Sequence, residues 1–419
     1  MKKTVCFCIV LLMLSMLCHA ADNTDSLSRT KKAVLTGFVK KKGSNKGIAD
    51  VIISIKGTTL SSETDTSGYY SLKNIPTGNR TLQVRKVGYK IYNKPIQLQE
   101  GSNKRDLAIE EDKVLLDEVV VSANREETIK RLSPVLVNVL SSKLYDMTQS
   151  TDLAQGLNFQ PGVRTEDNCQ NCGYTQVRIN GLDGHYSQIL IDSRPIFSAL
   201  NGVYGLEQIP SNMIDRVEVI RGGGSALYGA SSIGGVINII TKEPVRNFAE
   251  FSHTIMSIDG RSCFQNNTTM NASVASSDHK AGLYVYGESH HRPGFDYDHD
   301  GYTEMPIING ETVGFRSFIK TGTYSKLSVQ YDNIREFRRG GNNLSLPAHE
   351  SNITEQIDHD INGGGINFAL YSPSSENHLN TYLSFQNTDR KSYYGGTGDG
   401  SAESVANALK SYGKTHDIT

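Results

Sequence analysis

The sequence has almost no net charge, no long apolar run and no tryptophan. The formal net charge of the 419 residues is -1, so no global basic field attracts nucleic acid. No segment approaches the roughly 18 consecutive apolar residues of a membrane-spanning helix. Hydrophobic residues make up only 37%, whereas glycine (39) and tyrosine (20) are plentiful. This composition favours many short strands with long polar loops over a helical enzyme.

The first residues are typical of a secretory signal peptide. Two lysines precede an apolar stretch from Val5 to Cys18, and Ala20 offers a small residue for cleavage, which predicts a signal peptide over residues 1–20. A membrane anchor is disfavoured because the stretch is too short. Lipidation of Cys18 is another alternative, although Leu17 stands where a small residue is wanted. Export without a spanning helix is compatible with a membrane β-barrel.

Residues 33–110 alternate short apolar stretches with glycine, proline and aspartate turns. Strands such as Val51–Ile55 and Leu82–Val84 predict a small β-sandwich. The stretches Gly47–Val51, Thr64–Tyr70 and Val87–Tyr89 resemble the carboxypeptidase regulatory-like domain. This segment contains neither histidine nor cysteine, so a peptidase-type metal site is excluded for want of ligands.

Residues 116–123 form a β-branched apolar run next to acidic residues. Two interpretations fit the run taken alone. It is either the last strand of the sandwich or an accessible strand that adds to the edge of a partner's sheet, where backbone hydrogen bonds provide the affinity.

Residues 124–243 carry the most specific signal of the chain. Its motifs follow one another as Asp152–Leu157, Gln160–Val163, Gln176–Gly181, Ile189–Asp192, Ile214–Gly229 and Gly234–Lys242. Together they resemble the plug domain of TonB-dependent outer-membrane receptors, which is an α/β domain inside a β-barrel. The resemblance implies that 116–123 is the TonB box, the strand that pairs with TonB. Its central residues are Glu118, Val119, Val120 and Val121.

Several charged residues recur within the predicted plug strands. They are Arg178, Asp192, Arg216, Glu218 and Arg221. A globule inside a polar lumen needs hydrogen-bonding partners on the barrel wall, so we expect these charges to pair with the barrel. Ordinary solvated charges at strand ends are the alternative interpretation.

Cys169 and Cys172 form a lone Cys-x-x-Cys pair. A disulfide, two thiols and metal ligation all remain open, although export favours oxidation and structural zinc wants four ligands. The family resemblance implies that loops near this pair form the apex of the plug and contact the ligand. The expected contact residues are Tyr174, Tyr186, Phe197 and Tyr204.

Residues 245–419 alternate apolar and polar side chains, as in Leu327–Asp332 and Leu379–Gln386. This alternation is typical of antiparallel transmembrane strands that are apolar outside and polar inside. Short turns near 276–280, 324–326 and 372–377 alternate with long loops near 293–312, 339–360 and 391–412. The residues after Glu243 suffice for about seven strands and the beginning of an eighth, whereas outer-membrane transporters with a plugged lumen have about 22. We therefore expect an incomplete barrel in a truncated chain.

An acidic loop follows within this region. Asp296, Asp298 and Asp300 match the opening of a calcium loop, but Ile307 stands where an EF-hand needs glutamate. A calcium site and a solvated acidic loop both remain open. Two adjacent histidines precede the loop, and because neighbouring strand residues point to opposite faces, haem ligation is a minority option.

The sequence thus predicts a mostly β protein: a small β-sandwich, an α/β plug and the first strands of an antiparallel transmembrane β-barrel. The leading hypothesis is TonB-dependent import of a ferric siderophore or similar metal chelate across the outer membrane of a Gram-negative bacterium. The implied partners are the TonB–ExbB–ExbD complex, outer-membrane lipid and the ligand. Haem, cobalamin or an oligosaccharide is the alternative cargo, and a non-transporting surface sensor is the alternative function. No nucleophile–base or metal constellation indicates an enzyme, and no cofactor other than calcium is expected.

Overall fold

The computed structural model describes residues 32–418 except 87–88, 91, 111–118, 121, 123–127, 131–132, 170, 172, 196–205, 224, 230–231, 245–246, 261–262, 373–376 and 398–400. Several predicted features therefore lie outside the described residues: the signal peptide over 1–20, Glu118, Val121, Cys172, Phe197 and Tyr204. The chain divides into two compact units, of which the first ends at Glu110.

The first unit is a β-sandwich of two four-stranded sheets. One sheet has the order β4-β1-β7, with β8 also on β1, and the other has the order β3-β2-β5-β6. Buried and less buried residues alternate along β1, as expected for strands with one face in a core. The strands are β1 (Lys32–Lys41), β2 (Ile52–Ile55), β3 (Ser61–Glu63), β4 (Tyr69–Pro76), β5 (Gly78–Arg85), β6 (Tyr92–Leu98), β7 (Gly101–Lys104) and β8 (Leu107–Ile109).

The second unit begins with the plug, an α/β domain around a five-stranded sheet. The sheet has the order β11-β16-β17-β14-β15, in which β14 and β17 are parallel and the other pairs antiparallel. A hairpin of β12 and β13 and the short pair β9–β10 lie outside this sheet. The strands are β9 (Val119–Val120), β10 (Thr128–Ile129), β11 (Val137–Ser141), β12 (Val163–Cys169), β13 (Tyr174–Ile179), β14 (Ser187–Ile191), β15 (Arg194–Pro195), β16 (Ile214–Arg221) and β17 (Gly235–Thr241). The helices are α2 (Ser142–Thr148), α3 (Leu153–Leu157), η2 (Gly184–Tyr186), η3 (Ser211–Met213) and α4 (Ser225–Tyr228).

Glycine-bounded apolar strands make the core of the plug. Val217, Val219, Ile237 and Ile239 have no exposed surface, because β16 and β17 are covered by other parts of the domain on both faces. Their near-continuous apolar sequence is what a strand buried on both faces requires. The same apolar cluster also contains Tyr284 and Tyr286, which lie further along the chain in β20 (Ala281–Arg292).

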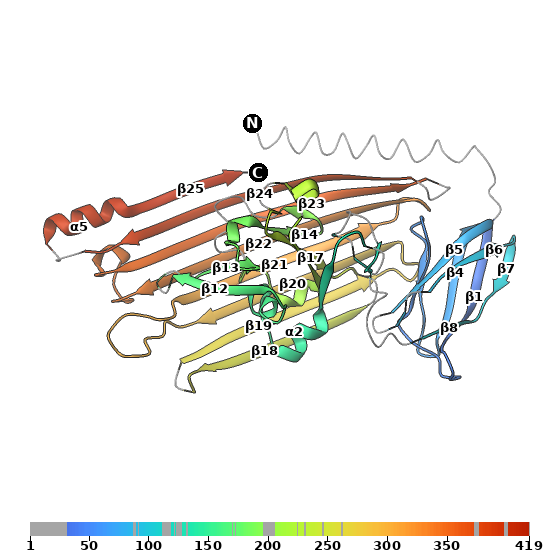
Figure 1. Ribbon diagram of the computed structural model, residues 1–419, viewed down its shortest axis with the longest axis horizontal. Helices are drawn as coiled ribbons and strands as arrows, with labels where there is room; N and C mark the ends of the chain where they lie inside the picture. Colours follow the sequence, from blue (N-terminus) through green and yellow to red (C-terminus); the bar gives the residue numbers. More distant parts are fainter. Residues whose placement is uncertain are drawn as a thin grey trace. The chain divides into compact units, whose positions relative to one another are not determined.

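The remainder of the second unit is one antiparallel sheet of eight strands, called the wall below. Its strands pair in sequence order from β18 to β25, and the plug lies against one of its faces (Figure 1). The strands are β18 (Phe248–Ile258), β19 (Cys263–Ala275), β20 (Ala281–Arg292), β21 (Ile307–Ile319), β22 (Ser325–Gly341), β23 (Thr354–Tyr371), β24 (His378–Gly395) and β25 (Tyr412–Ile418). Between β24 and β25 lie α5 (Ala402–Ala408) and η6 (Leu409–Ser411), and η5 (Ala348–Glu350) follows β22.

The fold class predicted from the sequence is confirmed. The wall is an unclosed antiparallel sheet of eight strands, in agreement with the predicted seven strands and the beginning of an eighth. The wall strands are longer than predicted, because β22 and β23 have 17 and 18 residues. Thr312, Arg339, Asp360 and Lys391, placed in loops from the sequence, therefore lie in strands.

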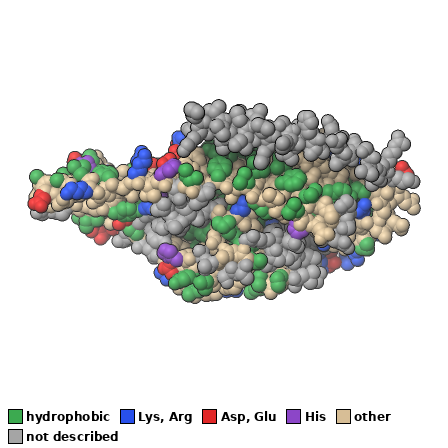
Figure 2. All heavy atoms as spheres, turned by 90° about the horizontal axis from the view of Figure 1, so that it is seen from above, with side chains coloured by type: hydrophobic (Ala, Val, Ile, Leu, Met, Phe, Trp, Pro, Cys, Tyr) green, Lys and Arg blue, Asp and Glu red, His purple; other side chains and the backbone are tan. Residues whose placement is uncertain are grey.

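The wall face that turns away from the plug is apolar along much of its length. Large side chains at spacings of four residues are exposed there: Phe251 (71%) and Ile255 (60%) on β18, and Leu379 (56%) and Leu383 (70%) on β24. Figure 2 shows hydrophobic side chains at the molecular surface in many places. The alternation of apolar and polar residues in the sequence produces this arrangement, since successive strand residues point to opposite faces.

None of the helices in the described part of the chain is long and apolar enough to cross a membrane.

Candidate functional site

The described part of the predicted TonB box is docked on the plug. Strand β9 pairs antiparallel with β10, and Val120 is fully buried in a cluster with Val137, Leu190 and Ile220. Ser122, two residues further on, is also fully buried. Val120 and Ser122 together attach this segment to the plug. The sequence predicts an accessible strand, whereas in this structure the segment is covered.

Ser122 makes hydrogen bonds through each of its polar groups. Its backbone N–H and its hydroxyl both donate to Oε2 of Glu218, at 2.8 and 2.7 Å. Its hydroxyl oxygen accepts from Nδ2 of Asn238 at 2.9 Å, and its carbonyl accepts from the Tyr228 hydroxyl at 3.0 Å. Because buried polar groups are costly unless hydrogen-bonded, this set of partners defines where Ser122 can lie.

Arg216 completes the surroundings of the Glu218 carboxylate. Its Nε donates to Oε1 of Glu218, and its Nη1 donates to Oδ2 of Asp215, both at 2.9 Å. Burial alone would lower the pKa of Arg216, but the Glu218 and Asp215 carboxylates raise it above its ordinary value. The arginine therefore keeps its charge beside a carboxylate that has no exposed surface.

The expected pairing of four plug charges with the wall is not what the described residues show. Arg216 and Glu218 pair with each other, and Arg178 forms an ion pair with Glu166 on the neighbouring strand β12. Arg221 lies against Gly162, another plug residue. Residues two apart on one strand, or diagonal to each other on paired strands, are near enough to neutralise each other, so the ion pairs of Arg216 and Arg178 stay within the plug. Asp192, the fifth of the recurring charges, pairs with the wall through Arg316.

The ion pairs between plug and wall involve Asp192 and several residues that the sequence did not single out. Arg316 on β21 donates through Nη1 to Oδ2 of Asp192 at 3.1 Å and to the Thr241 carbonyl at 3.2 Å. Glu243, which follows the last plug strand, accepts from Lys326 of β22 at 2.9 Å and from Arg316 at 3.5 Å. These contacts connect two wall strands to the ends of β14 and β17.

Asp192 and Ser193 form the two-residue turn between β14 and β15, and both have positive φ angles of 47° and 65°. Such a turn usually takes asparagine and glycine, because L side chains are strained at positive φ. The turn is held by Asn238, whose Oδ1 accepts from the Ser193 N–H at 2.9 Å. Thr241 donates from its N–H and hydroxyl to Asp192, at 3.1 and 2.8 Å.

Arg338 on β22 is the charged centre of a second contact between plug and wall. Its side chain is 1% exposed and binds both carboxylate oxygens of Glu336, at 2.7 and 3.0 Å. Nη1 donates to the Gly173 carbonyl at 2.8 Å and also pairs with Glu207, both of which belong to the plug. Gln208 donates to Glu336 at 2.9 Å. One wall arginine thus links the loop after β12 with the segment before η3.

A buried carboxyl lies near this contact. Asp152 caps α3 by accepting from the Gln155 N–H at 3.0 Å, as expected of an aspartate at a helix N-cap. Burial raises the pKa of the Asp152 carboxyl well above its ordinary value, and the nearby Glu207 carboxylate raises it further.

The apex predicted to contact the ligand is only partly described. Tyr174 begins β13, and Tyr186 in η2 is 47% exposed. Cys169 donates from Sγ to Oε2 of Glu355 on β23 at 3.1 Å, so this loop touches the wall. Because Cys172 lies outside the described residues, the Cys169–Cys172 disulfide stays a prediction.

The plug does not fill all the space beside the wall. A cavity of about 270 Å³ is lined by Arg194, Gln208 and Met213 of the plug and by Gln330 and Asp332 of β22, among others. Its mixed lining shows that polar as well as apolar groups meet at this interface.

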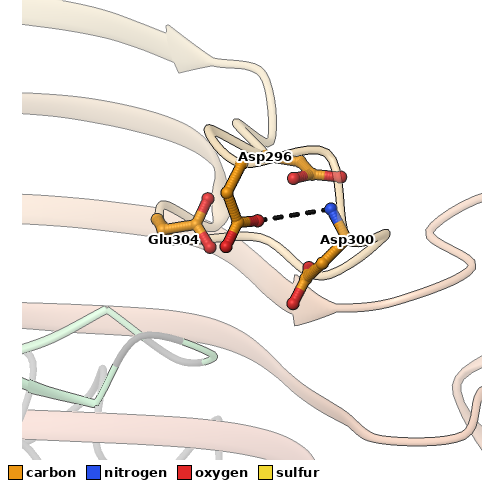
Figure 3. A group of neighbouring side chains, drawn as sticks. Asp296, Asp300 and Glu304 are labelled. Carbon is orange, nitrogen blue, oxygen red and sulfur yellow. Dashed lines mark hydrogen bonds between the residues drawn. The ribbon is translucent and has the colours of Figure 1, made fainter.

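The acidic loop after β20 gathers four carboxylates. Asp296, Asp298, Asp300 and Glu304 each place an oxygen within 4.8 Å of the others, and Figure 3 shows Asp296, Asp300 and Glu304 grouped around the loop. Oxygen ligands of this kind suit a hard cation such as calcium. The sequence indicates the three aspartates and offers Glu304 only in a geometry that differs from an EF-hand, and the fold brings all four together. The loop also supports itself, since Asp296 accepts from the His299 and Gly301 N–H groups at 2.7 and 2.9 Å.

Sequence reasoning missed the residues that join plug and wall. Arg316 and Arg338 occupy strand positions whose side chains are expected to line a polar lumen, and the sequence places Lys326 in a turn. In the sequence, a lumen-facing charge that is solvated cannot be distinguished from one that contacts the plug. Glu207 and Glu243 gave only a weak indication of a contact with the wall, because they flank the plug motifs without belonging to them.

An α/β plug bonded to one face of a long-stranded antiparallel sheet is the arrangement of a plugged, incomplete barrel. A family model of the TonB-dependent receptor plug domain matches residues 130–236, and one of the CarboxypepD_reg-like domain matches residues 35–121. The chain thus carries a CarboxypepD_reg-like domain followed by a TonB-dependent receptor plug domain. The relatives and the solved structure that it resembles are named as transporters.

Curated relatives agree with this assignment. The vitamin B12 transporter BtuB of Photobacterium profundum is 37% identical over 140 residues, covering 32% of this chain and 22% of the relative. The protein of the same name from Vibrio vulnificus is 28% identical over 264 residues, covering 61% of this chain and 41% of the relative. The matched part of the chain thus spans less than half the length of either relative.

A solved structure shows the same fold. The unliganded ferric citrate transporter FecA superposes with a TM-score of 0.50 at 16% sequence identity, over 62% of this chain and 40% of the transporter.

Proposed function

We propose that this receptor imports a scarce nutrient across the outer membrane, with energy supplied through TonB. The observation that carries the proposal is the chemistry of the contact between plug and wall. Ion pairs and hydrogen bonds of Arg316, Lys326, Arg338 and Gln208 make much of that contact. Polar contacts can be exchanged for water at little net cost, so such a plug can be displaced and can return.

Two further observations support this proposal. The outward apolar face of the wall suits contact with lipid. The segment around β9 lies between the accessory domain and the plug along the chain, and a periplasmic partner could bind it as a single short strand. TonB, with ExbB and ExbD, is the partner proposed for that strand. The outer membrane of a Gram-negative bacterium is the proposed location.

The proposed cargo is a metal chelate, and a ferric siderophore is the first expectation. Cobalamin is the second, and the B12 transporters among the relatives favour it. Both are large, rigid ligands of low abundance, for which passive diffusion does not suffice. Haem and oligosaccharides are the remaining alternatives.

The test combines uptake with a ligand panel. The complete gene is expressed in cells that lack their own receptors, and ferric siderophores, cyanocobalamin, haem and oligosaccharides are offered with and without TonB. We expect TonB-dependent uptake of a chelate and tight binding of the same chelate by the purified receptor. Binding of a glycan alone would reject the proposed cargo, and uptake that persists without TonB would reject the proposed mechanism.

A further inference from the structure

Two opposite charges face the cavity between the plug and the wall. Arg194 belongs to the plug strand β15 and Asp332 to the wall strand β22, and both residues line the cavity. In the described part of the chain, the two side chains form no ion pair with each other. A buried charge is costly unless it is paired and hydrogen-bonded, so each of these groups gains from a partner of opposite charge inside the cavity.

Arg194 is largely buried and only loosely paired. Its side chain is 12% exposed, and Nη2 lies 3.9 Å from Oδ2 of Asp192. Arg316 binds that same carboxylate more closely, at 3.1 Å. Within the described residues, Nε of Arg194 is buried and has no hydrogen-bond partner. The guanidinium therefore has N–H groups available for an oxyanion, whose geometry it matches.

Glycine residues leave the wall side of the cavity open. Asp332 pairs with Gly314 on β21 and with Gly363 on β23, so it stands between two positions without side chains. A Cβ atom at Gly363 would lie 3.0 Å from Oδ2 of Asp332. A Cβ atom at Gly365, two positions further along β23, would lie 2.5 Å from Nη1 of Arg194. These glycines thus provide the room that the two charged groups occupy.

The rest of the lining is partly apolar, and the cavity is small. Ile209 and Met213 of the plug and Ile334 and Ile361 of the wall line it. Its volume of about 270 Å³ lies just below the roughly 300–1,000 Å³ of sites that take drug-sized ligands. The cavity therefore suits a molecule with a short hydrocarbon part and polar groups for the two charges.

We propose that this cavity binds a small zwitterion of the aliphatic α-amino acid class, with its carboxylate on Arg194 and its ammonium group on Asp332. A simple anion satisfies Arg194 but is repelled by Asp332, and a simple cation has the reverse problem. A zwitterion satisfies both charges, and the apolar part of the lining accepts its side chain. Because the ligand contacts both plug and wall, it stabilises the docked plug by mass action. The site requires neither TonB nor the proposed cargo.

Isothermal titration calorimetry of the purified protein in detergent tests the proposal, with glycine, L-alanine, L-leucine and L-methionine as probes. We expect at least one of them to bind with a Kd of about 1 mM or below. The amide of that amino acid lacks the carboxylate, and its N-acetyl derivative lacks the ammonium group. Each analogue should bind about tenfold more weakly or worse, because one buried charge then stays unpaired. Absence of binding by all four amino acids, or undiminished binding of either analogue, would overturn the proposal.

Variants of the lining locate the ligand. Arg194→Gln and Asp332→Asn each remove one charge at similar side-chain size, and each should weaken binding about tenfold or more. Gly363→Ala keeps both charges but narrows the site beside Asp332, so it should also weaken binding, and it serves where a charge variant does not fold. Arg335→Gln is the control, because Arg335 is 65% exposed and is not among the described residues that line the cavity. Wild-type affinity in the folded cavity variants would overturn the assignment of the site.

Discussion

At the scale of single residues, buried charges determine how the plug sits. Glu218 has no exposed surface and accepts from Ser122 and Arg216, while Glu336 and Arg338 neutralise each other at 4% and 1% exposure. A buried ion pair contributes little net stability, but breaking one by removal of a single partner is strongly destabilising. Such pairs therefore specify one arrangement of the plug residues and contribute less to its net stability.

Replacement of Arg338 should show this effect. Arg338→Met leaves Glu336 and Glu207 without their cation, and we expect a loss of about 3–5 kcal/mol in unfolding free energy, measured by denaturant unfolding of the purified protein. A second substitution, Glu336→Gln, should recover part of this loss, because it removes the uncompensated charge while Gln208 remains nearby.

Arg335→Met is the matched control for that experiment. Arg335 lies on the same strand, with its side chain 65% exposed and Nε 3.8 Å from Asp360, and exposed ion pairs contribute about 0–1 kcal/mol. A loss for Arg338→Met no larger than for Arg335→Met would show that the buried cluster has no structural role.

At the scale of elements, the sequence predicted strands better than contacts. The alternation in Leu327–Asp332 and the glycine-bounded apolar runs of β16 and β17 follow directly from burial of one or both faces, so they are visible in a single sequence. Loop limits were less accurate, because Arg339 and Lys391 look like loop residues but continue β22 and β24. The plug partners of Arg316 and Arg338 depend on which strands meet in space, and a single sequence does not contain that information.

The acidic loop between β20 and β21 allows a prediction about an element. We expect calcium to raise the thermal stability of the protein, because a cation that binds only the folded loop stabilises it by about 2.7 kcal/mol at a concentration 100 times its Kd. Asp298→Asn combined with Asp300→Asn should abolish the shift, as measured by thermal unfolding with and without calcium. Asp278→Asn, in an exposed turn where Asp278 pairs with Lys280, should leave it unchanged. A melting temperature independent of calcium would identify the cluster as a solvated acidic loop.

At the scale of the whole molecule, the plug and the wall are one folded unit with separable contacts. The apolar part of their interface includes Tyr284 and Tyr286, and much of the rest is polar. Import in the proposed mechanism requires part of the plug to move away from the wall. A covalent link between the two should therefore stop import without preventing ligand binding.

The chain offers a natural position for such a link. Sγ of Cys169 in the plug lies 3.1 Å from Oε2 of Glu355 on β23, so Glu355→Cys, in a Cys172→Ser background, places two thiols near each other across the interface. Oxidation should join them, since disulfides form in exported proteins. We expect the oxidised receptor to bind its chelate with unchanged affinity but to lose uptake, and a reductant to restore uptake. Glu355→Ser in the same background controls for loss of the carboxylate. Undiminished uptake by a receptor shown to be fully cross-linked would contradict this expectation. It would mean that the apex of the plug stays on the wall during import. The path would then open elsewhere along the interface, where Arg316 and Lys326 hold the opposite ends of the plug strands.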